Sequence, residues 1–349
     1  MNKPKHRIPS LDGLRGFSIW AVLAAHIYSH YQSSISRTGH IVHVILADLS
    51  YLGVTIFFVI SGFLITNILA KSELNLGNFY KRRAIRILPA SFIYIAIILV
   101  FGHATLLQAV YALTFTTTFA FAHAYTPLQQ LWSLSVEECF YLLWPLAMLH
   151  GRQSAKRYGW TLMVVAPILR LILRHYGYLE YSHLAPAVAD SLAAGCLFAL
   201  YREEVLGFAR RNLSSGPVCA ALTLSTIVIG LVIFNRGLVT LWGIVLLLIV
   251  LSISSTIVRE DRILNAGPLA WSGLLSYSIY LWQQPFLVMG GPVDFLPLRL
   301  ALTFIAAYLS YRFIELPALE LLARAGKRKN IPAQLEERPI LVAGGRENG

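Results

Sequence analysis

The sequence predicts an all-α, polytopic membrane protein with ten transmembrane helices. Of its 349 residues, 56% are hydrophobic and only 13% are charged, whereas soluble globular domains are about 45–50% apolar and about 25% charged. So few charges cannot cover a water-soluble protein of this size, and the mean hydropathy of +0.62 agrees. Three cysteines are too few for a disulfide scaffold, and 12% aromatic residues are too many for a disordered chain. A soluble cytosolic enzyme is therefore excluded.

Ten apolar stretches approach the length of about 20 residues that a membrane-spanning helix needs. The expected spans are Leu14–His30, Leu49–Ala70, Ala84–Phe101, Leu131–Leu149, Trp160–Arg174, His183–Tyr201, Pro217–Phe234, Leu238–Ile257, Leu269–Met289 and Leu296–Ile314. After about Ala325 the composition turns to Lys, Arg, Glu, Gly and Pro. We therefore expect a membrane domain over 8–324 and a loose cytoplasmic tail over 325–349.

The basic residues orient these spans, because cytoplasmic loops of membrane proteins collect Lys and Arg. With the N-terminus inside, most of the 29 Lys and Arg fall on the cytoplasmic side. An eleventh apolar segment, Thr105–Ala124, would move Arg152, Lys156 and Arg157 outside if it were a full span. We expect a re-entrant or surface helix there, and both termini in the cytoplasm. The net charge of +12 then reflects membrane orientation, and no nucleic-acid partner is expected.

Ionisable residues inside a membrane are costly, and they are candidates for function. In the first span, Arg15 and His26 are eleven residues apart, which places them on one face of a helix about 16 Å apart along its axis. Asp12 lies one turn from Arg15 and can pair with it. The alternative is an interfacial arginine and a hydrogen-bonded core histidine, and spacing alone does not separate the two.

Two further clusters are charged. A basic loop expected before the third span contains Arg82, Arg83 and Arg86, and guanidinium groups suit phosphate binding. Cytoplasmic loops of membrane proteins are commonly basic, and this tendency accounts for the three arginines even if they bind no phosphate ligand. The fourth span contains Glu137 and Glu138, and two adjacent carboxylates at membrane depth favour a polar cavity or a cation partner. Alternatively, Glu137 and Glu138 lie at the membrane interface, at the outer end of the span, and have no functional role.

The ninth span contains the polar and aromatic string SYSIYLWQQPF. An aromatic belt at the membrane interface explains Tyr277, Tyr280 and Trp282. It does not explain Gln283, which we keep as a hydrogen-bonding candidate.

Taken together, these segments resemble the integral-membrane acyltransferase 3 family. That family includes O-acetyltransferases of lipopolysaccharide O-antigen, exopolysaccharides and nodulation factors. The resemblance runs from Ile8 to about Pro317 and rests on six strings in the expected order: RIPSLDGLRGFSIWAVLAAH, GVTIFFVISGFLIT, RRAIRILPA, LWSLSVEECFYLLWP, SYSIYLWQQP and YRFIELPA. It implies a ten-helix fold with the acyl donor supplied from the cytoplasm.

The resemblance also implies residue roles. His26 corresponds to the essential histidine and Arg15 to its intramembrane companion. Arg83 and Arg86 match an Arg–x–x–Arg motif implicated in handling acyl-coenzyme A, and Glu137 matches the first acid of the SVEE string. We expect catalysis by His26, Arg15 and Glu137. Arg82, Arg83 and Arg86 are expected to bind the donor, and the acceptor is expected to contact Asp12, Glu138, Tyr277, Tyr280, Trp282 and Gln283.

The chain departs from the family pattern at three positions. Thr55 stands where relatives often carry Asp, Cys139 replaces a common Gln, and Gln283 stands where many relatives have His. Gln283 thus removes a titratable group near the outer end of the ninth span, and a mechanism that needs two histidines would depend on that group. Some relatives add an extracytoplasmic hydrolase-like domain, which we expect this chain to lack.

The expected function is transfer of an acyl group, most simply acetyl, from cytoplasmic acyl-coenzyme A to a hydroxyl of a cell-surface or lipid-linked carbohydrate. The expected location is the bacterial inner membrane, with membrane lipid, donor and carbohydrate as partners and with no metal or permanently bound cofactor. His26 can act as a general base or carry the acyl group as a nucleophile. The alternative is a small transporter or channel with an intramembrane His/Arg/Glu pathway. Such a protein is expected to have an internal repeat between its two halves, and the sequence shows none. The oligomeric state stays open.

Overall fold

The computed structural model describes residues 9–31, 37–71, 75–119, 126–178, 184–235, 238, 241–259, 264–265, 267–288 and 295–322, and these ranges contain helices and no β-strand. The α-helices are α1 (Pro9–Tyr31), α2 (Arg37–Lys71), α3 (Leu76–Val100), α4 (Leu106–Leu113), α5 (Trp132–Leu149), α6 (Arg152–His175), α7 (Ala185–Leu200), α8 (Arg202–Asn212), α9 (Gly216–Asn235), α10 (Trp242–Arg259), α11 (Gly267–Leu274), α12 (Ser276–Leu287) and α13 (Leu296–Ser310). Two 3₁₀ turns, η2 (Thr117–Phe119) and η3 (Gln129–Leu131), precede α5, and a π-helical turn, η6 (Tyr311–Glu315), follows α13. The all-α prediction is confirmed.

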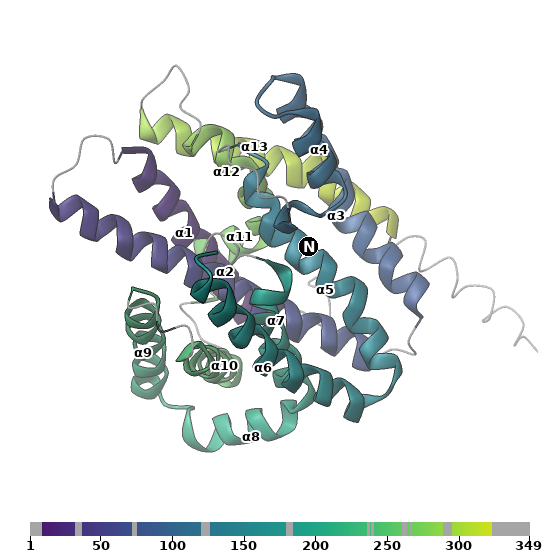
Figure 1. Cartoon of the computed structure of the whole chain (residues 1–349), viewed down its shortest axis with the longest axis vertical. Coiled ribbons are helices and arrows are strands. Elements are labelled where there is room, and N and C mark those ends of the chain that lie inside the picture. Colours follow the sequence, from purple (N-terminus) through teal and green to yellow (C-terminus); the bar gives the residue numbers. More distant parts are fainter. Residues whose placement is uncertain are drawn as a thin grey trace, which may run out of the picture.

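Helices α1 and α2 form the centre of the bundle (Figure 1). Helix α2 packs against α1 and α7, and α9 and α10 lie side by side next to it (Figure 1). Helix α12 packs against α1, α3 and α13. The largest buried apolar cluster includes Leu23, Phe58, Trp144 and Leu192, and so joins α1, α2, α5 and α7.

Glycine permits the closest helix contacts. A Cβ atom added to Gly62 of α2 would lie 2.0 Å from the carbonyl oxygen of Leu192, and one added to Gly195 of α7 would lie 2.0 Å from that of Val59. Because real side chains never approach a backbone oxygen so closely, only glycine allows α2 and α7 to pack at this distance. The crossing of α1 and α11 is equally close, since a Cβ atom on Gly273 would lie 1.7 Å from the carbonyl oxygen of Asp12.

Within the described part of the chain, four helical segments are long and apolar enough to cross a membrane: Val44–Ala70, Leu76–Val100, Gly216–Ile233 and Trp242–Arg259. Helix α7 is apolar but shorter, and α6 carries basic residues near both of its ends. The count of ten spans stays a prediction. The segment expected to lie on the outer surface contains the eight-residue helix α4, which at 1.5 Å per residue is too short to span a bilayer.

Two details of the expected elements are wrong. The basic residues expected in a loop before the third span lie inside α3. This helix begins at Leu76, and Asn75 caps its N-terminus because its side chain accepts a hydrogen bond from the backbone N–H of Asn78. The ninth span is also not one continuous helix, because Leu275 separates α11 from α12. Helix α8 was not expected, although its acidic first turn and basic last turn are typical of helix ends. The expected tail at 325–349 lies outside the described residues.

Candidate active site

His26 lies on α1 and meets α12 through a hydrogen bond. Its Nδ1 atom is 3.1 Å from Oε1 of Gln283, whose side chain is fully buried. The Nε2 atom of Gln283 donates in turn to Oε1 of Gln130, at 3.3 Å. The His26 side chain keeps an accessible surface. The histidine is therefore hydrogen-bonded to the neutral amide of Gln283, which is itself bonded to that of Gln130.

A second cluster holds charges between α3, α5 and α2. Arg83 of α3 lies 3.3 Å from Glu138 of α5 (Nη2 to Oε1), and the two side chains are 18% and 21% exposed. The Arg83 guanidinium also stacks over the ring of Tyr141, 3.6 Å from its centroid. Ser61 of α2 donates to Oε1 of Glu137, at 2.7 Å. Both acids of the fourth expected span therefore have polar partners inside the bundle.

The remaining arginines extend this charged cluster toward the end of α13. The charge of Arg86 interacts with those of Arg15, Arg83 and Glu315, and Glu315 of the π-helical turn accepts a hydrogen bond from Ser278 of α12. The Nε atom of Arg15 is buried without a hydrogen-bond partner among the described residues. Because the Arg86 side chain is exposed, this group of like charges stays accessible to an anionic ligand.

Glu137 lies near Arg83 of the charged cluster and near Tyr280 of α12. Tyr280 donates to the backbone oxygen of Gln130 at 2.5 Å, close to the amides that hold His26. The bundle therefore contains a hydrogen-bonded histidine and, in a separate cluster, three arginines and three carboxylates. This combination can bind an anionic donor and remove a proton from a hydroxyl group.

Sequence comparison decides the family. A family model described as an acyltransferase domain, Acyl_transf_3, matches residues 8–313. The chain belongs to this acyltransferase family. It is 29% identical to the peptidoglycan O-acetyltransferase OatA of Listeria monocytogenes, over 89% of this chain and 55% of that protein.

Other relatives carry similar names. The chain is 28% identical to the O-acetyltransferase OatA of Staphylococcus aureus, over 91% of this chain and 58% of that protein. It is 26% identical to the putative peptidoglycan O-acetyltransferase YrhL of Bacillus subtilis, over 89% of this chain and 55% of that protein. The chain therefore spans little more than half the length of these relatives. No solved structure matches it.

The other residues predicted for the acyltransferase site have different surroundings. Tyr277 donates to the backbone oxygen of Ile87 at 2.9 Å and so ties α12 to α3. Trp282 packs edge-on against Tyr94, with ring centroids 5.5 Å apart. Arg82 is exposed on α3. Tyr277 therefore lies next to Arg86 and Glu315 of the charged cluster, whereas the ring contact of Trp282 is with Tyr94.

Several polar residues of the site were not predicted. Gln130, Tyr94, Ser61 and Tyr141 contact the predicted residues directly, yet each is an ordinary polar or aromatic residue in its own segment. Glu315 directly follows the tenth expected span and lies within the YRFIELPA string, so its position had a usable signal. Among the described residues, no three His, Cys, Asp or Glu side chains gather as metal ligands would.

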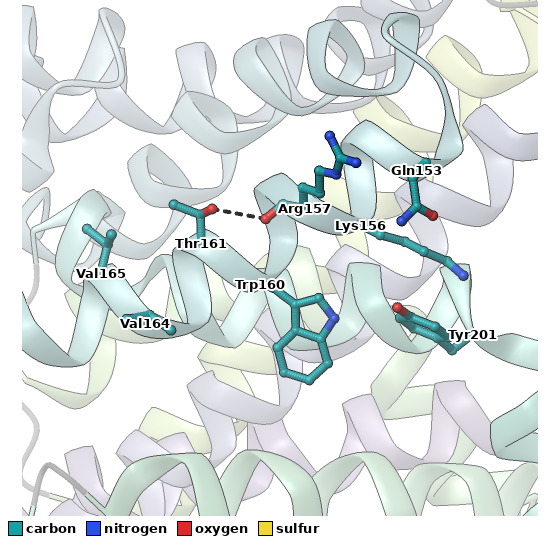
Figure 2. A pocket seen from close by; sticks show the side chains of 8 residues that line it. All are labelled: Gln153, Lys156, Arg157, Trp160, Thr161, Val164, Val165 and Tyr201. Carbon is teal, nitrogen blue, oxygen red and sulfur yellow. Dashed lines mark hydrogen bonds between the residues drawn. The ribbon is translucent and has the colours of Figure 1, made fainter.

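An open hollow of about 530 Å³ lies apart from this site, along α6 (Figure 2). It is lined by Gln153, Lys156, Arg157, Trp160, Thr161, Val164, Val165 and Tyr201. Lys156 extends over the Tyr201 ring, 3.7 Å from its centroid. The hollow contains none of the predicted site residues, and its basic pair offers a control for the arginines of α3.

Proposed function

We propose that this chain transfers an acyl group, in the first instance acetyl, from acyl-coenzyme A to a hydroxyl group of a cell-surface carbohydrate. The observation that carries this proposal is that the acyltransferase region contains both a hydrogen-bonded histidine, His26, and an accessible group of arginines, Arg15, Arg83 and Arg86. Peptidoglycan is the first acceptor to test, because the names of two relatives state it. A lipid-linked glycan is the second.

Arg83 and Arg86, with the exposed Arg82 beside them, are proposed to bind the phosphates of the donor. All three lie within the first three turns of α3, which is the cytoplasmic end in the proposed topology. Arginine is well suited to this role because its fork-shaped guanidinium group binds phosphate oxygens in pairs. The donor's acyl arm would extend from this end of α3 toward His26.

In the proposed reaction, His26 takes the proton of the acceptor hydroxyl, and the hydroxyl oxygen forms a bond to the acyl carbon. The carbon–sulfur bond then breaks, and the leaving sulfur takes a proton from the imidazolium. In a two-step route, an imidazole nitrogen of His26 bonds to the acyl carbon as the carbon–sulfur bond breaks, and the acyl group then passes to the hydroxyl oxygen, whose proton goes to the thiolate. Arg15 is proposed to stabilise the oxyanion, and Glu137 to orient the reacting groups. The acceptor contacts predicted for Asp12, Glu138, Tyr277, Tyr280, Trp282 and Gln283 stay proposals.

We also propose ten spans, both termini in the cytoplasm, and a location in the bacterial inner membrane. Exposed Ser215 would then face the cytoplasm and exposed Thr105 the outside. In a background without the three native cysteines, a membrane-impermeant maleimide should label Thr105→Cys in intact cells and Ser215→Cys only after lysis. The reverse pattern would overturn this orientation.

The central test uses the protein in nanodiscs with radiolabelled acetyl-coenzyme A and a soluble peptidoglycan fragment. His26→Ala should abolish acetyl transfer, whereas His175→Ala, at an exposed position at the end of α6, should retain it. Transfer that survives in His26→Ala would move the chemistry to another residue. Absence of donor binding by correctly folded wild-type protein would favour the transporter alternative.

The donor site has a matched control. Arg83→Ala combined with Arg86→Ala should abolish binding of acetyl-coenzyme A. Lys156→Ala combined with Arg157→Ala removes the same charge from the hollow on α6 and should leave binding intact. Loss of acetyl-coenzyme A binding only in the Lys156→Ala and Arg157→Ala variant would place the donor in that hollow. If the protein is a transporter, both double variants should keep their transport activity.

A further inference from the structure

Gln283 and Gln130 form a hydrogen-bonded chain that runs from His26 to two backbone carbonyl groups. Gln130 lies in the η3 turn before α5 and is 5% exposed, and Gln283 of α12 is fully buried. Buried amides need partners for their hydrogens and lone pairs. Each amide can in principle face either way, so its direction must be derived from partners that can only donate or only accept.

The direction of Gln130 follows from a backbone carbonyl. Its Nε2 atom lies 2.8 Å from the carbonyl oxygen of Leu281, and a carbonyl oxygen can only accept. Its second partner is the Tyr94 hydroxyl oxygen, at 3.1 Å. Tyr94 donates its own hydrogen to the carbonyl oxygen of Pro127 at 2.8 Å, so its oxygen accepts from Gln130. Both amide hydrogens of Gln130 are thus used, and its Oε1 atom faces Gln283.

The direction of Gln283 follows from that of Gln130. Oε1 of Gln130 accepts from Nε2 of Gln283 at 3.3 Å, which turns Oε1 of Gln283 toward Nδ1 of His26, at 3.1 Å. An amide oxygen carries no hydrogen, so the hydrogen of this contact must lie on Nδ1 of the histidine. In the neutral imidazole, the lone pair is then on Nε2.

We propose that Gln130 and Gln283 are positioning residues that hold His26 in its Nδ1–H form, so that Nε2 is the atom that reacts. This inference rests on the proposed function. Nε2 takes the proton of the acceptor hydroxyl as the new carbon–oxygen bond forms, and it returns that proton to the sulfur as the carbon–sulfur bond breaks. The amides exchange no proton, and the Nδ1–H bond persists throughout. In the covalent route, Nε2 bonds to the acyl carbon as the carbon–sulfur bond breaks and the sulfur leaves as thiolate. The acyl group then passes from Nε2 to the hydroxyl oxygen, whose proton goes to the thiolate.

The decisive measurement is the tautomer of His26, read from nitrogen and carbon NMR shifts of the protein in nanodiscs with isotope-labelled histidine. His26→Asn identifies the His26 signals among the ten histidines. The spectra are recorded about two units above the usual histidine pKa of about 6.5, where imidazole is neutral. We expect Nδ1–H in the wild type. An Nε2–H signal in the wild type would overturn the inference without any variant being needed.

Gln283→Leu removes the acceptor of the Nδ1–H bond, and Gln284→Leu is its matched control. Gln284 is the next residue of α12, is 8% exposed, and its Oε1 atom has no hydrogen-bond partner among the described residues. Gln283→Leu should give a mixture of tautomers and reduce kcat about 10- to 100-fold with the KM for acetyl-coenzyme A unchanged. Gln130→Leu should act in the same direction. Gln284→Leu should leave both tautomer and rate unchanged.

The outcomes separate this inference from the proposed function. A lower rate in Gln283→Leu with an unaltered Nδ1–H signal would show a merely structural role and overturn the positioning inference. No acetyl transfer by the wild type, with Nδ1–H observed, would overturn the proposed function and support the tautomer assignment.

Discussion

The ion pair between α6 and α7 gives a quantitative test of how this bundle tolerates buried charge. Arg170 donates to both carboxylate oxygens of Asp190, with Nη1–Oδ1 at 3.0 Å and Nη2–Oδ2 at 2.5 Å. The two side chains are only 6% and 1% exposed, and Arg170 also donates to the carbonyl of Ala187. Asp190→Asn would leave the guanidinium group buried without its counter-charge. Such a change costs about 3–5 kcal/mol.

Replacing both residues gives the opposite expectation. Arg170→Met combined with Asp190→Leu removes both charges and refills the space with apolar atoms, which is commonly neutral or stabilising. At about 2–4 °C per kcal/mol, Asp190→Asn should lower the Tm by about 6–20 °C, and the double variant should melt near the wild type. Arg157→Met, at an exposed position on α6, is the control and should change little.

Thermal unfolding of all four proteins in one nanodisc preparation measures these shifts. A Tm for Asp190→Asn equal to that of the wild type would refute the reasoning, as would a double variant that is as unstable as the single one. Acyl transfer gives an independent readout, because the pair lies outside the proposed active site. The stable double variant should remain an active acyltransferase, whereas a transporter that uses this pair as part of its pathway would be inactivated.

Two further changes test the site and the helix packing. Glu137→Gln keeps the shape of the side chain but removes its charge near Arg83. The rate of acetyl transfer should fall at least about tenfold, while the Tm should stay within about 2 °C of the wild type. An unchanged rate would exclude Glu137 from the chemistry. Gly195→Leu forces a side chain against the backbone of α2 and should strongly lower the Tm. Its control is Gly243→Ala of α10, where an added Cβ meets nothing within 4 Å, and this change should be neutral or stabilise the protein by up to about 1 kcal/mol. Equal Tm values for the two variants would contradict the close packing of α2 against α7.

The sequence predicted the helical class and the position of most helices, but it misplaced several helix starts. Apolar runs show which residues suit the membrane core, whereas a helix continues for as long as its backbone hydrogen bonds do. Lys and Arg are good helix formers, so α3 and α6 begin eight residues before the apolar runs that predicted them. Hydropathy gives no signal for this extension, or for the break at Leu275.

The candidate site was predictable only where its residues share one helix. The spacing of Arg15 and His26 fixes their common face, and the paired acids stand out inside an apolar run. The partners of these residues come from distant segments: Gln283 is 257 positions from His26, and Ser61 is 76 positions from Glu137. No local periodicity encodes such contacts, because they follow from the packing of α12 and α2 against α1 and α5.

The distribution of charge within the site has a physical reason. A carboxylate beside His26 would fix its tautomer as the amides do, but it would also place a further buried charge in a region of low dielectric, which is costly without a cation partner. The amide of Gln283 directs the proton to Nδ1 without adding a charge. The acids stand instead next to arginine, where Glu138 offsets Arg83 and Glu315 lies near Arg86. With exposed Arg82 included, four arginines (Arg15, Arg82, Arg83 and Arg86) outnumber the three acids (Glu137, Glu138 and Glu315) by one charge, whereas the proposed base, His26, is hydrogen-bonded to a neutral amide.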